Sequence, residues 1–84
     1  MSHREPIDDA AWRPWVEHVA TALEVDASPV SPRAIHDLTG EVASRYQRPM
    51  APVSAYLWGL AIATHPDRDP GDLAQAIIAA LPET

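Results

Sequence analysis

The sequence predicts an all-α fold: a compact four-helix domain with short loops. Apolar residues recur at helical spacing along most of the 84 residues, and no segment alternates as a strand does. Prolines also stand where periodic stretches begin or stop, which is typical of helix boundaries. We therefore expect one helical domain over residues 11–84, preceded by a flexible segment over residues 1–10.

The first helix is expected over about residues 11–24. Asp8 and Asp9 precede it, where carboxylates favour the positive end of a helix. Pro14 is compatible with this helix only if it lies in the first turn, because proline has no N–H to donate. The apolar residues that share one face are Trp12, Trp15, Val16, Val19 and Leu23.

The second helix is expected over about residues 32–47. Ser31 followed by Pro32 is a strong start signal, a capping residue before a proline at the first helical position. Glu41 and Arg45 are spaced to form an (i, i+4) ion pair, and Pro49 is expected to end the helix. Its apolar stripe comprises Ile35, Leu38, Val42 and Tyr46.

The third and fourth helices are expected over about residues 52–65 and 70–81. The fourth has the same start signal as the second, Asp69 before Pro70, and Leu73, Ile77 and Leu81 form its apolar line. The third is apolar on nearly every side, and such a helix is normally surrounded by protein. Gly59 inside it is unfavourable unless another helix approaches closely.

Two interpretations of the third helix remain open. Its faces are Val53, Leu57, Leu60 and Ala61 with Tyr56 at the edge, and opposite them Trp58 and Ile62. In one interpretation the other three helices surround it, which is the commoner use of such residues. In the other, Trp58 and Ile62 form an exposed patch that binds a partner or a second copy of the chain.

Composition argues against several classes of function. Six basic residues stand against twelve acidic ones, a net charge of −6, which disfavours binding to nucleic acid. There is no cysteine, and no stretch resembles a signal peptide or a membrane-spanning segment, so a cytoplasmic protein without membrane contact is expected. His3, His18, His36 and His65 lack metal-binding spacing, so no metal, cofactor or catalytic residue is expected.

The best candidate for a small-molecule site is the turn before the third helix. The N-terminus of a helix favours anions, and Arg45 and Arg48 provide guanidinium groups beside it. Tyr46 and the Ser54 hydroxyl add polar contacts for a phosphate-bearing ligand. The alternative is structural: Arg48 satisfies the last carbonyl groups of the second helix and supports the turn.

The segment from Arg48 to Ala61 resembles a known family. Its Arg48-Pro49-Met50-Ala51-Pro52 turn and Leu57-Trp58-Gly59-Leu60-Ala61 helix, behind a first helix with Trp12 and Trp15, are similar to a small bacterial domain of unknown function. That domain occurs alone or fused behind a molybdopterin-guanine dinucleotide biosynthesis (nucleotidyltransferase-like) domain. The resemblance extends from Trp12 to Leu81 and implies an accessory role near molybdenum-cofactor maturation.

These observations lead to a first hypothesis and its alternatives. The first is a non-catalytic interaction module that docks onto a protein partner or onto itself through Trp58 and Ile62, with Arg48 and Tyr46 at the polar margin. The second is a small protein that binds an anionic molecule at the Arg45–Arg48 turn. A third is an enzyme subunit that needs a partner to complete its site.

Overall fold

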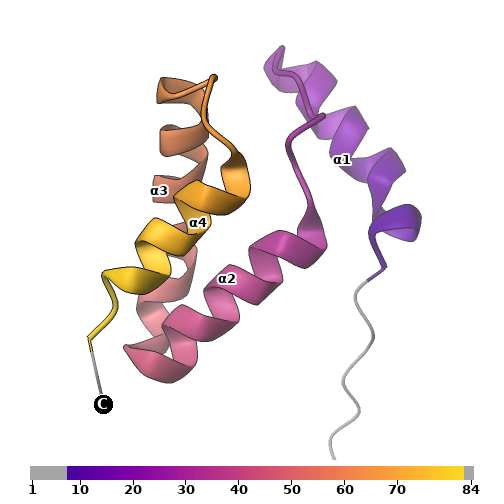
Figure 1. Cartoon of the computed structure of the whole chain (residues 1–84). Helices are drawn as coiled ribbons and strands as arrows, with labels where there is room; N and C mark the ends of the chain where they lie inside the picture. The colour runs from indigo at the N-terminus through magenta and orange to yellow at the C-terminus, as the bar shows by residue number, and fades with distance from the viewer. Residues whose placement is uncertain (1–7, 83–84) are drawn as a thin grey trace, which may run out of the picture. The chain divides into compact units, whose positions relative to one another are not determined.

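The computed structural model describes residues 8–82, and within them every regular element is helical (Figure 1). The four helices are α1 (Asp9–Leu23), α2 (Pro32–Arg45), α3 (Ala51–Thr64) and α4 (Pro70–Ala79), and a short 3₁₀ helix, η1 (Arg48–Met50), precedes α3. The prediction of an all-α chain with four helices is confirmed.

The chain divides into two compact units, Met1–Ala34 and Ile35–Thr84. The described part of the first holds α1, the following loop and the start of α2. The described part of the second holds the rest of α2 and the elements from η1 to α4. Residues 1–7 of the segment predicted to be flexible, with His3, lie outside the described residues, whereas Asp9 and Ala10 belong to α1.

Three helix starts are fixed by side-chain caps. The Asp8 Oδ1 atom accepts a hydrogen bond from the Ala11 N–H at 3.0 Å, so α1 begins two residues earlier than predicted. The Ser31 and Asp69 side chains accept from the backbone N–H groups of Ala34 and Asp72, at 3.2 Å each. The start signals read from Ser31-Pro32 and Asp69-Pro70 are thereby confirmed, since each cap satisfies an N–H left unpaired by the first turn.

Two expectations about prolines are wrong. Pro14 lies inside α1 beyond its first turn, where it cannot donate a helical hydrogen bond. Pro49 does not end α2: that helix stops at Arg45, Gln47 is extended, and Pro49 lies in η1. The backbone is already extended at Gln47, so the helix ends before the residue whose conformation Pro49 restricts, which is Arg48.

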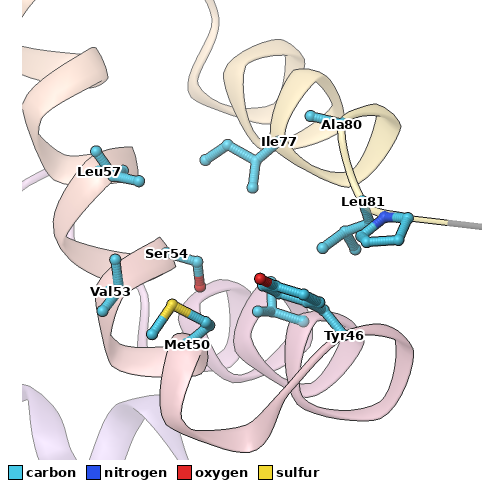
Figure 2. Close-up of a pocket in the computed structure, with 10 residues that line it drawn as sticks. Tyr46, Met50, Val53, Ser54, Leu57, Ile77, Ala80 and Leu81 are labelled. Atoms are coloured by element: carbon cyan, nitrogen blue, oxygen red, sulfur yellow. The ribbon is translucent and has the colours of Figure 1, made fainter.

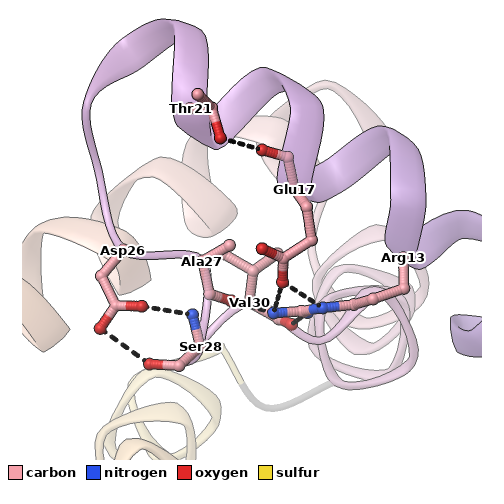
Figure 3. A network of polar contacts seen from close by, with 7 residues as sticks. All are labelled: Arg13, Glu17, Thr21, Asp26, Ala27, Ser28 and Val30. Atoms are coloured by element: carbon pink, nitrogen blue, oxygen red, sulfur yellow. Dashed lines mark hydrogen bonds and ion pairs between the residues drawn. The ribbon is translucent and has the colours of Figure 1, made fainter.

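The loop of the first unit, between α1 and α2, is held by polar contacts (Figure 3). The Arg13 guanidinium on α1 donates to the backbone oxygens of Ala27 and Val30, at 2.6 Å each, and its Nε atom donates to Glu17 at 3.0 Å. Asp26 accepts hydrogen bonds from the backbone N–H and the hydroxyl of Ser28, at 2.9 Å each. These contacts give a segment that is exposed at most of its positions a defined conformation.

The Ser28 contacts lower the pKa of the Asp26 carboxyl, with the backbone N–H as the larger cause and the hydroxyl as the next. We expect Ser28→Ala to raise the pKa of Asp26 part of the way to its ordinary value, because the backbone N–H remains. A carboxyl with a lowered folded pKa stabilises the fold above its ordinary pKa, and this contribution disappears as the pH falls through the folded value. An NMR titration of Asp26 in both proteins measures the change, and an unchanged pKa would contradict the assignment.

In the second unit, α4 packs against α3 (Figure 1). The buried side chains there include Leu38 and Val42 from α2, Trp58 from α3 and Leu73 from α4. Leu38, Val42 and Leu73 belong to the apolar lines predicted for their helices. In the first unit, by contrast, Trp15 and Leu23 of the predicted apolar face are 69% and 65% exposed.

Candidate functional site

One face of α3 is apolar and exposed. Val53, Tyr56, Leu57 and Leu60 are 44%, 71%, 53% and 49% exposed, and we call these four residues the α3 stripe. Their i, i+3, i+4 and i+7 spacing places them on one side of the helix. The other helical segments of the second unit therefore leave this side of α3 exposed, contrary to the expectation that they surround it.

The opposite face of α3 is the covered one. Trp58 and Ser54 are each 5% exposed, and the Trp58 indole N–H donates to the Pro70 oxygen at 2.9 Å, which links α3 to the first residue of α4. The hypothesis that Trp58 is an exposed docking residue is wrong, because its ring is buried and its one polar atom already donates to a backbone oxygen. Ile62 is half-buried.

A groove of about 400 Å³ adjoins the α3 stripe within the second unit (Figure 2). We call it the α3–α4 groove, because residues of α3 line one side and residues from the end of α4 line the other. The stripe and the groove share Val53 and Leu57, so together they form one continuous apolar surface. The groove is lined by Val42, Tyr46, Met50, Val53, Ser54, Leu57, Ile77, Ala80, Leu81 and Pro82.

The structure brings two of the predicted site residues together in this groove, Tyr46 and Ser54. Arg45 and Arg48 do not line it. The Arg45 Nη1 atom lies 3.5 Å from a carboxylate oxygen of Glu41, which confirms the predicted (i, i+4) pair, and Arg48 is exposed in η1. The predicted residues therefore do not form one cluster.

Several polar groups at the start of α3 are already bonded within the chain. The backbone N–H groups of Met50 and Ala51 already donate to Gln47 and Arg48, and Pro52 has none. The Ser54 hydroxyl donates to the Ala51 oxygen at 2.6 Å. Of the groups that the anionic-ligand hypothesis uses, the Ser54 hydroxyl and the Arg45 guanidinium are thus engaged within the chain.

Several groove residues, among them Met50 and Ile77, were not predicted as site residues. The sequence did carry a signal for the stripe, since Val53, Leu57 and Leu60 stand out as one face. In the commoner interpretation of the sequence, that face belongs to the core. No pattern in the sequence indicates that the end of α4 lies across from α3.

Other kinds of site find little support in the described part of the chain. Among residues 8–82, no three histidine or carboxylate side chains gather in a way that could hold a metal ion. None of the helices described here has both the length and the apolar character needed to cross a bilayer. A second, smaller apolar hollow of about 220 Å³ lies in the first unit, lined by Trp15, Val16, Val19, Ala20, Leu23, Val25 and Val30.

Comparison with protein families identifies the family of the chain. The model of the family described as "Domain of unknown function (DUF6457)" matches residues 8–83. The chain belongs to this family. The matched residues include all four helices, the α3 stripe and the α3–α4 groove. No curated protein and no solved structure matches this DUF6457 chain.

Proposed function

We propose that this DUF6457 domain is a non-catalytic interaction module that docks onto another protein chain through the α3 stripe and the α3–α4 groove. The observation that supports it most is the exposure of Val53, Tyr56, Leu57 and Leu60 on a helix without a charged residue. Contiguous exposed apolar surface is typical of protein interaction sites. An aromatic residue such as Tyr56 is common among the residues that dominate binding energy.

The composition of the surface also favours a protein partner over a small anionic ligand. A stable complex needs extended apolar contact with a few polar groups, and Tyr46 and Ser54 are the polar members of the groove lining. The side chains of the stripe are about half exposed in the isolated chain. A partner that covers them removes their apolar surface from water, and each Å² buried in this way contributes roughly 25 cal/mol to the free energy of binding.

We further propose that this docking serves molybdenum-cofactor maturation in the cytoplasm. The support is the resemblance of the segment from Arg48 to Ala61 to a bacterial domain found alone or behind a nucleotidyltransferase-like domain. The module would contribute binding to that route and no reacting group.

Site-specific photo-crosslinking tests the docking role. We expect Tyr56→p-benzoylphenylalanine to yield a covalent product in cells that make this chain, because position 56 is the most exposed of the stripe. The matched control is Gln75→p-benzoylphenylalanine, at an exposed position of α4 outside the groove lining. Adding Leu60→Glu to the Tyr56 variant should remove the product, and mass spectrometry identifies what is joined. Equal products at positions 56 and 75, or none at 56, would contradict the proposal.

A further inference from the structure

We infer that the chain docked at the α3 stripe and the α3–α4 groove is a second copy of this protein, bound through antiparallel packing of α3 on α3. This inference rests on the proposed function and names its partner. Three observations support it: the charge of the helix, the spacing of the stripe and the place of the groove beside it.

The charge distribution permits a like partner at α3. The chain carries a net charge of −6, so two copies repel each other unless they meet at an uncharged surface. Helix α3 offers that surface: from Ala51 to Thr64 it has no acidic or basic residue, whereas each of the other three helices has at least one. A strongly charged partner would find no opposite charge on this helix, and a second α3 needs none.

The spacing of the stripe allows two copies to fit each other. In a two-fold dimer the same patch serves both subunits, so the surface must complement itself. Antiparallel α3 helices that cross between Tyr56 and Leu57 place Leu60 of one copy opposite Val53 of the other. Because Val53 also lines the groove, Leu60 of each copy is positioned to enter the groove of the other.

The dimer is expected to be of moderate strength. A helix of 14 residues is about 21 Å long, and four partly exposed side chains with one groove give less than the roughly 800 Å² per partner of a standard interface. We therefore expect a dissociation constant on the order of 100 µM, which concentration-dependent methods can resolve.

Sedimentation velocity of the purified full chain over roughly 10 µM to 1 mM tests the inference. We expect the wild type to convert from monomer to dimer, and Leu60→Glu to raise the dissociation constant by at least about tenfold, because two carboxylates would be placed in the apolar interface. Gln75→Glu adds the same charge at an exposed position outside the groove lining and should leave the dimer unchanged. Tyr56→Glu is the second stripe variant, and circular dichroism verifies that each variant is folded.

The outcomes separate this inference from the proposed function. A dimer that survives both stripe variants overturns the inference, because another face then holds the copies together. A wild type that stays monomeric to 1 mM also overturns it; the docking role then survives if position 56 still crosslinks to a different protein in a Leu60-dependent way. A monomer without any such product contradicts both. Loss of the dimer in both stripe variants, with Gln75→Glu unaffected, supports the inference.

Discussion

Replacing Trp58 with alanine is expected to lower the free energy of unfolding by about 3–5 kcal/mol, the range typical of removing a buried aromatic side chain. Trp58 is 5% exposed and its indole N–H donates to the Pro70 oxygen, so the substitution creates a cavity and removes the link between α3 and the start of α4. Such a loss is a large share of the total stability of a small domain. Urea unfolding followed by circular dichroism measures it.

Two further substitutions separate packing from the hydrogen bond. Trp58→Phe keeps most of the ring and removes the N–H, and it should cost about 1–2 kcal/mol. Trp15→Ala is the matched control, the same change at a side chain 69% exposed, and it should stay within about 0.5 kcal/mol. If Trp15→Ala proved the more damaging of the two alanine variants, the assignment of Trp58 to the covered face of α3 would be wrong.

The starts of α2 and α4 were predictable because each is a local event. A serine or aspartate followed by a proline combines a side-chain acceptor with a preset backbone angle, and Ser31 and Asp69 both cap as this rule requires. Helix ends were less predictable. Helix α2 ends before the extended residue Gln47, and α4 ends at Ala79 where the sequence pattern continues to Leu81. The apolar spacing continues beyond the residues at which these helices end, so it does not indicate where they end.

The orientation of α3 was the main feature that the sequence left undecided. Periodicity identified its two faces, but both are apolar, so hydrophobicity did not show which one is covered. The structure covers the face of Ser54 and Trp58, where the hydroxyl and the indole N–H each find a backbone oxygen. The Ser54 hydroxyl donates to Ala51 in the same helix, whereas the Trp58 indole N–H donates to Pro70 of α4. The second bond depends on a tertiary contact that no local sequence pattern predicts.

Arg13 shows the same limit in the first unit. In the sequence it is an ordinary charged residue of α1, yet its guanidinium holds two carbonyl groups of the following loop at 2.6 Å each. Ala27, one of these two partners, is 4% exposed. The planar fork of arginine suits this double contact, because it presents several N–H donors in fixed directions.

We expect Arg13→Ala to destabilise the protein by about 2 kcal/mol. Hydrogen bonds from a charged donor are stronger than those between neutral groups, and the two carbonyl contacts of Arg13 are partly buried. Arg13→Lys should recover less than half of that loss, because one ammonium group cannot reproduce the fork. Glu17→Gln keeps both carbonyl contacts and weakens only the exposed ion pair with Arg13, so its cost should stay below about 0.5 kcal/mol.

Hydrogen exchange gives the sharper readout for Arg13, because the effect should be local. Amide exchange of the loop from Val25 to Val30 should accelerate in Arg13→Ala and remain near wild type in Glu17→Gln. Equal acceleration in both variants would mean that the ion pair orders the loop and that the carbonyl contacts contribute little. Acceleration in Arg13→Ala alone would assign the order of the loop to the two backbone oxygens that the guanidinium binds.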